Sequence, residues 1–155
     1  MRRSVFGIAI SLAALCVSSL LNSCENVFPD DKLDNFWRLN RVEYLEGKNF
    51  KGELRDADTL KAVFYGFSRH LLQIENHSGG GSYWGNTIDK GDSLTLDFSA
   101  YQKPENLLKY DASRTLDGLQ TCGIESLLTT FSIDRLTRTE MVLSTSRVVL
   151  HFEKW

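Results

Sequence analysis

The residue types that support catalysis or metal binding are few in this sequence, and they are widely separated. Residues 66–70, Gly-Phe-Ser-Arg-His, begin like the Gly-x-Ser-x-Gly turn that exposes a nucleophilic serine, but His70 stands in place of the second glycine. His70, His77 and His151 are too scattered to predict a zinc site, with Cys122 as the only thiol in the same part of the chain. We therefore predict no catalytic centre, no metal site and no cofactor, and the protein is not expected to be an enzyme.

The first 23 residues have the composition of an export signal. Arg2 and Arg3 form a short basic start, and residues 4–23 contain no charged side chain and many Val, Ile, Leu and Ala. This layout is typical of a cleaved secretory signal. An uncleaved membrane anchor is the alternative, because an uncharged segment of about 20 residues can just span a bilayer.

Residues 21–24, Leu-Asn-Ser-Cys, favour the cleaved signal over the anchor. They resemble the bacterial lipobox, in which a small residue precedes the cysteine that accepts the lipid. We therefore expect residues 1–23 to be a lipoprotein signal peptide, Cys24 to hold the lipid, and residues 24–32 to be a tether. The resemblance implies that the lipid attaches the protein to the bacterial outer membrane, on a face that the sequence leaves open.

Cysteine count and charge narrow the class of protein further. Once Cys16 has left with the signal and Cys24 is acylated, Cys122 is the remaining thiol, so no intramolecular disulfide is expected. Residues 24–155 hold 16 basic and 20 acidic side chains, a net charge of −4. Nucleic-acid binders usually carry a basic stripe, so we do not expect a nucleic-acid partner.

Alternating apolar and polar residues predict strands along most of the remaining chain. The clearest case is residues 93–101, in which the Leu and Phe side chains share one face. Residues 141–144 and 148–155 repeat the pattern on either side of a short turn.

Two segments depart from simple alternation. Trp37 and Leu39 share one face, whereas Val42 and Tyr44 join it only if the register shifts by one residue, as it does at a β-bulge. Residues 111–123 lack a strand pattern and are expected to form a long loop.

The pattern gives about seven to nine strands within residues 33–155, a length suited to one domain. A sheet of that size curls, and closure removes its edges. We therefore predict an all-β fold, a small antiparallel up-and-down barrel of about eight strands. A two-sheet β-sandwich is the alternative.

Residues 35–37, Asn-Phe-Trp, and the last strands resemble the lipocalin superfamily. The tripeptide stands where that superfamily carries Gly-x-Trp, with Asn35 in place of the glycine. Residues 131–155 are similar to the ending of lipocalin-like lipoproteins of the Bacteroidetes. The resemblance implies a single barrel closed at one end by Trp37, and it makes Arg147 the nearest candidate for the arginine that stacks on that tryptophan.

An eight-stranded barrel is just wide enough to be filled by its own side chains or to hold one small ligand. Sequence does not separate these outcomes, because both need an apolar interior. We expect ten residues to line the interior and to be the candidate ligand-binding residues: Trp37, Phe64, Phe67, Leu94, Leu96, Phe98, Met141, Leu143, Leu150 and Phe152.

The function predicted from these features is non-catalytic binding of a small apolar or amphipathic ligand by a lipid-anchored envelope protein. Burial of the apolar surface of the ligand would drive binding. The alternative is a filled barrel that acts as an accessory module and binds an envelope protein or a glycan through its loops.

Overall fold

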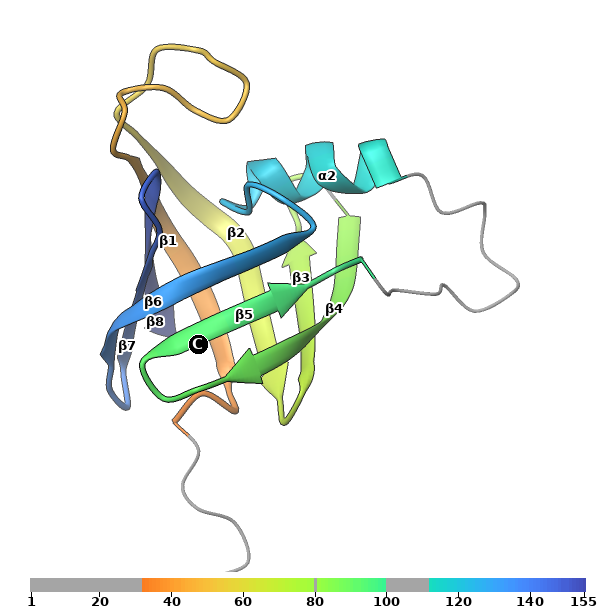
Figure 1. Ribbon diagram of the computed structural model, residues 1–155, viewed down its shortest axis with the longest axis vertical. Coiled ribbons are helices and arrows are strands. Elements are labelled where there is room, and N and C mark those ends of the chain that lie inside the picture. The colour runs from red at the N-terminus through yellow and green to blue at the C-terminus, as the bar shows by residue number, and fades with distance from the viewer. Residues whose placement is uncertain (1–31, 80, 100–111) are drawn as a thin grey trace, which may run out of the picture. The chain divides into compact units, whose positions relative to one another are not determined.

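Eight antiparallel strands, each hydrogen bonded to its neighbour in sequence, close into a barrel in which β8 pairs with β1 (Figure 1). The computed structural model describes residues 32–79, 81–99 and 112–155. The strands are β1 Phe36–Tyr44, β2 Ala57–Ser68, β3 Leu71–Asn76, β4 Gly81–Asp89, β5 Ser93–Asp97, β6 Leu128–Leu136, β7 Glu140–Ser144 and β8 Val148–Lys154. The predicted up-and-down barrel is therefore confirmed, and the sandwich alternative is wrong.

Alternation of side chains along each strand separates the interior of the barrel from its surface. In β5, Leu94 and Leu96 are fully buried, whereas the hydroxyl of Thr95 lies outside and meets the Thr130 hydroxyl of β6 at 2.9 Å. This arrangement follows from the two-residue period of a strand. It confirms the inward face predicted for Leu94, Leu96 and Phe98. The strand predicted for residues 93–101 ends earlier, at Asp97, and residues 100–101 lie outside the described residues.

The predicted β-bulge lies in β1. In the pairing of β1 with β8, the two-residue step from Leu39 to Arg41 faces the one-residue step from Phe152 to His151, so β1 holds one extra residue there. The register with β2 shifts at the same point. The shift returns Val42 and Tyr44 to the interior side, where both are buried with Trp37 and Leu39.

A helix replaces the loop that the sequence predicted at residues 111–123: α2 spans Ala112–Thr121. Gly118 and the threonines give the segment low intrinsic helix propensity, which is why the sequence did not indicate it. Tertiary packing stabilises the helix instead. Leu119 is fully buried, and Gly118 leaves room for Tyr83 of β4 beneath the helix.

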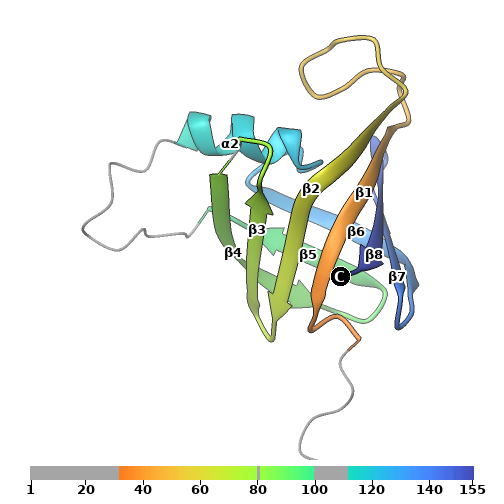
Figure 2. The same cartoon turned by 180° about the vertical axis from the view of Figure 1, so that it is seen from behind.

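Apolar side chains close both ends of the barrel. At the lower end, Leu33 lies beneath Trp37, whose indole nitrogen donates a 3.1 Å hydrogen bond to the Leu33 carbonyl oxygen. At the upper end, α2 lies across the barrel, as Figures 1 and 2 show from opposite sides. Leu119, Cys122 and Ile124, from the end of the helix and the turn after it, are fully buried there.

The part of the chain that would direct export lies outside the described residues. This includes the predicted signal peptide, the lipid-accepting Cys24 and the tether as far as residue 31. The compact unit that contains the barrel spans Lys32–Trp155. Within the described residues, α2 is too short and too polar to cross a bilayer, and no other helix qualifies.

Candidate binding cleft at the barrel mouth

Nine of the ten predicted interior residues are buried in the barrel core: Trp37, Phe67, Leu94, Leu96, Phe98, Met141, Leu143, Leu150 and Phe152. They come from β1, β2, β5, β7 and β8 and from the residue after β5. The structure therefore brings them together as expected. Their role in ligand binding stays a prediction.

The prediction that Phe64 lines the interior is wrong. Phe64 lies on the outer face of β2, where its ring contacts His77 at a centroid distance of 5.5 Å and Trp155 at 5.0 Å. Its neighbours in the strand, Val63 and Tyr65, are the buried ones. Strand parity explains the error, because Phe64 and Phe67 are three residues apart and fall on opposite faces of an unbroken strand.

Side chains fill the interior of the barrel. A space large enough for a ligand would leave accessible surface on the residues around it, but Trp37, Tyr65 and Phe131 have none. The same is true of many neighbours from other strands: Leu39, Leu72, Ile74, Leu94, Leu96, Met141, Leu143, Val148 and Leu150. A ligand would have to separate these side chains in order to enter.

A cleft of about 420 Å³ lies outside this core, at the mouth of the barrel. One wall is the loop of residues 45–56 between β1 and β2, and the opposite wall is the C-terminal turn of α2. The lining residues are Tyr44, Asn49, Phe50, Lys51, Glu53, Arg55, Asp58, Thr59, Leu60, Gln120 and Thr121. We call this site the mouth cleft.

Aromatic and charged groups meet in the mouth cleft. The Phe50 ring stands edge-on to Tyr44, with centroids 5.6 Å apart. The Tyr44 hydroxyl donates a 2.9 Å hydrogen bond to Asp58, whose other carboxylate oxygen accepts a 2.6 Å bond from Arg55. Burial is the larger cause, and the hydrogen bond with Asp58 the next, of a raised pKa at Tyr44. This hydroxyl therefore stays protonated and remains a donor.

Asn49 shapes the loop that forms the outer wall of the mouth cleft. Its side-chain oxygen accepts hydrogen bonds of 3.0 Å from the backbone nitrogens of Lys51 and Glu53. Its amide nitrogen donates a 2.7 Å bond to the Glu53 carboxylate. These bonds, made by a buried asparagine, fix the backbone of the loop beside Phe50.

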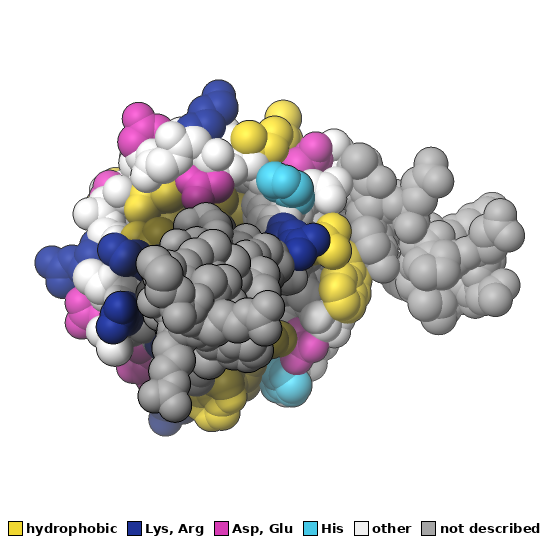
Figure 3. Space-filling model, turned by 90° about the horizontal axis from the view of Figure 1, so that it is seen from below, with side chains coloured by type: hydrophobic (Ala, Val, Ile, Leu, Met, Phe, Trp, Pro, Cys, Tyr) yellow, Lys and Arg dark blue, Asp and Glu magenta, His cyan; other side chains and the backbone are white. Residues whose placement is uncertain are grey.

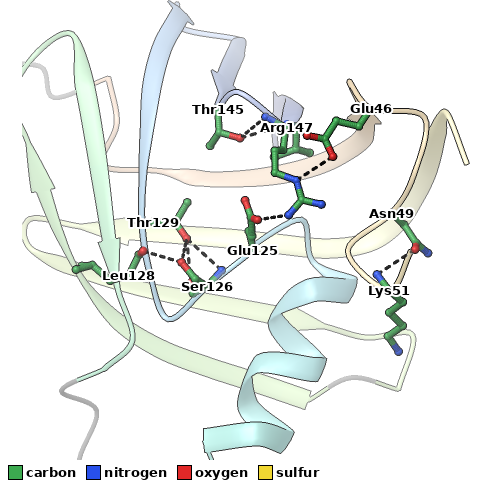
Figure 4. Close-up of polar contacts among 10 residues, drawn as sticks. Glu46, Asn49, Lys51, Glu125, Ser126, Leu128, Thr129, Thr145 and Arg147 are labelled. Atoms are coloured by element: carbon green, nitrogen blue, oxygen red, sulfur yellow. Dashed lines mark hydrogen bonds and ion pairs between the residues drawn. The ribbon is translucent and has the colours of Figure 1, made fainter. Parts of the chain in front are cut away.

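Arg147 links this loop to the rest of the mouth (Figure 4). Its guanidinium forms an ion pair with Glu125, which follows α2, and lies 3.4 Å from the Glu46 carboxylate in the loop. It also stands over the Phe50 ring, 5.8 Å from the centroid. The prediction that Arg147 stacks on Trp37 is therefore wrong. Trp37 lies at one end of β1, whereas Arg147 lies beside Tyr44 at the opposite end of that strand.

Cys122 has the environment of a structural residue. The thiol is fully buried, and burial raises its pKa to about 11, against smaller opposing effects of hydrogen bonds with Thr121 and Asn76. A thiol is nucleophilic only as the thiolate, so this cysteine is inert near neutral pH. Among the described residues, no cluster of His, Cys, Asp and Glu is arranged to hold a metal ion.

Sequence reasoning missed the mouth cleft. Its two walls, residues 45–56 and the end of α2, are more than 60 positions apart in the chain. Residues 45–56 are mostly polar, a composition typical of a surface loop, and only Phe50 and two leucines interrupt it. Nothing in that segment indicates its partner across the mouth.

The comparisons with known proteins agree with this architecture. The family model described as "Lipocalin-like domain" matches residues 18–155, so the chain belongs to the lipocalin-like domain family. None of the curated proteins matches the chain.

Two solved structures share the fold. A lipocalin-like protein from Bacteroides uniformis is 18% identical with a TM-score of 0.55, and the match covers 80% of this chain and 99% of that one. An uncharacterized protein from Bacteroides eggerthii is 16% identical with a TM-score of 0.56, covering 79% of this chain and 99% of that one. The family model shows the family, and the two solved structures from Bacteroides share the fold of the barrel.

Proposed function

We propose that this chain is a non-catalytic, lipid-anchored protein of the bacterial outer membrane that binds a small amphipathic molecule. The observation that carries the proposal is the mouth cleft. It has a volume of about 420 Å³, whereas the interior of the barrel is filled by side chains. Ligand sites generally have volumes of about 300–1,000 Å³. The lipocalin-like fold supports a binding role in general, and the cleft gives that role a location.

The lining of the mouth cleft matches a ligand with an apolar body and a polar end. Phe50 and Leu60 offer apolar surface for the body of the ligand. Arg55 and Asp58 offer donors and acceptors at fixed positions for its polar end. Binding would remove apolar surface from water and would exchange water for these fixed polar groups.

Native mass spectrometry of the full chain, purified from a bacterial envelope, tests this proposal. We expect a discrete added mass of a few hundred daltons that organic extraction removes. Phe50→Ala should abolish the added mass, whereas Leu54→Ala, an exposed position on the same loop outside the cleft, should retain it. A bare protein, even after incubation with lauric acid, cholate and haem, would contradict the proposal.

The lipid anchor is tested separately. Replacement of Cys24 by Ser removes the predicted acceptor, so the protein should lose its acyl mass and remain unprocessed, with residues 1–23 still attached. Replacement of Cys16 by Ser is the matched control and should leave acylation unchanged. An acyl mass that persists in Cys24→Ser would contradict the anchor.

The filled interior also favours the alternative, an accessory module that contacts an envelope protein or a glycan through its loops. A photo-reactive amino acid at position 54, an exposed position of the loop of residues 45–56, distinguishes this function. Crosslinking to one specific envelope component would support the alternative, and its absence would leave small-ligand binding as the better account.

A further inference from the structure

A second hollow lies on the outer face of the barrel, and no described residue lines both this hollow and the mouth cleft. It has a volume of about 430 Å³ and is lined by Phe36 of β1, Phe64 of β2, Glu75 and His77 at the end of β3, and Trp155 after β8. Pairing of β8 with β1, and of β1 with β2, brings these segments side by side. We call it the outer groove.

The outer groove exposes aromatic rings that the protein nevertheless holds in place. Trp155 is 70% exposed and Phe36 is 53% exposed. The backbone nitrogen of Trp155 donates a 3.0 Å hydrogen bond to the carbonyl oxygen of Phe36, and its ring lies edge-on to Phe64 at 5.0 Å. The Arg38 guanidinium stands 5.4 Å from the centre of the Trp155 ring. An ordered and exposed tryptophan loses little freedom when a ligand stacks on it.

Polar groups border the aromatic surface on one side. The Glu75 carboxylate accepts a 2.5 Å hydrogen bond from Gln73 and lies 3.0 Å from the Nε2 atom of His77. The His77 ring in turn stands edge-on to Phe64. The groove therefore places a carboxylate and an imidazole beside an aromatic floor.

The charge of the residues that line the outer groove indicates which class of ligand can bind there. Among the described residues, neither Lys nor Arg lines the outer groove, and the nearby Arg38 is already paired with Glu153. The Glu75 carboxylate would repel a phosphate or a fatty-acid carboxylate. A plain acyl chain would leave Glu75 and His77 without new hydrogen bonds. The outer groove thus fits a neutral ligand that has both an apolar face and hydroxyl groups.

We propose that the outer groove binds a neutral hexopyranose unit of a glycan. The C–H groups on one face of a pyranose ring carry partial positive charge and suit the negative face of the Trp155 indole. Sugar hydroxyls then hydrogen bond to Glu75 and His77 at the border. Charge-assisted bonds to a carboxylate are the stronger kind, which makes Glu75 the group that orients the sugar.

Saturation-transfer NMR with the full chain tests this site, using maltopentaose, cellopentaose, chitotetraose and mannopentaose as probes. At least one oligosaccharide should bind saturably to the wild type. Trp155→Ala should weaken that binding by about tenfold or more, as the loss of a central aromatic contact does. Trp84→Ala is the matched control, because Trp84 is another exposed tryptophan but lies on β4, outside the groove.

Glu75→Gln provides a second variant that keeps the aromatic surface and the fold, and it should weaken oligosaccharide binding severalfold. Circular dichroism checks that each variant is folded. The proposal is overturned if no oligosaccharide binds, if Trp155→Ala binds as the wild type does, or if lauric acid alone binds in a manner that depends on Trp155. It is also overturned if ultracentrifugation shows self-association that Trp155→Ala abolishes, because a second copy would then be the occupant.

Discussion

The hydroxyl of Tyr65 donates a 2.6 Å hydrogen bond to the backbone carbonyl oxygen of Cys122. Tyr65 stands inside the barrel on β2, and Cys122 follows α2, so one bond joins the core to the turn that closes the upper end. Burial is also the main cause that raises the pKa of Tyr65, which keeps the donor proton in place.

Replacement of Tyr65 by Phe should destabilise the protein without changing its shape. The phenyl ring would keep its edge-on contact with Phe152, whereas the buried Cys122 carbonyl would lose its partner from β2. An unsatisfied buried acceptor costs about 1–3 kcal/mol. Urea unfolding should show this loss in the free energy of unfolding. An unchanged value would mean that the bond makes no net contribution.

The stability of the protein should fall with rising pH above about 9 because of Cys122. The unfolded thiol has its ordinary pKa of 9.0, and the folded pKa is about 11. Between these values the unfolded state loses its proton first, so each pH unit costs about 1.4 kcal/mol of unfolding free energy. Chemical denaturation at pH 8, 9, 10 and 11 measures the slope of the unfolding free energy against pH. At the upper end of this pH range, ionisation of tyrosines makes the slope steeper.

Cys122→Ala supplies the comparison for that slope. The variant keeps a small apolar side chain at the position but has no group that ionises there, so the fall between pH 9 and 10 should become shallower. An identical slope in both proteins would show that the thiol does not control the alkaline transition.

Arg147→Ala should loosen the mouth of the barrel more than it destabilises the fold. Partly exposed ion pairs contribute little to global stability, about 0–1 kcal/mol. Loss of the contacts with Glu46, Glu125 and Phe50 should nevertheless speed amide hydrogen exchange in residues 45–56. Arg135→Ala removes the ion pair with Glu140 at the other end of the barrel, and exchange in the loop should then stay unchanged.

Leu96 and Phe64 should differ sharply when each is replaced by Ala. Leu96 is fully buried in the filled interior, and such truncations cost about 2–5 kcal/mol. Phe64 lies on the outer face, half-buried against Trp155, so its truncation should cost only about 1 kcal/mol. Thermal unfolding of the two variants ranks them. A larger loss for Phe64 would contradict the assignment of the two faces.

The alternation of side chains determined much of the barrel. Leu94, Leu96 and Phe98 are spaced two residues apart, so a strand puts them on one face wherever it pairs. The shift between Leu39 and Val42 likewise required a bulge, because burial of both on one side needs an extra residue. Both inferences depend on neighbouring residues in the chain, and both are confirmed.

Tertiary structure decided the rest. Residues 62–67 are apolar on both faces, so only the regular pairing of residues 63–68 with β3 fixed Phe64 on the outside. Packing against Tyr83 stabilised α2 where local propensity is weak. The filled interior and both hollows depend on contacts between segments far apart in sequence. Apolar residues look alike whether they pack against one another or surround a ligand, so only their positions in space could distinguish the two.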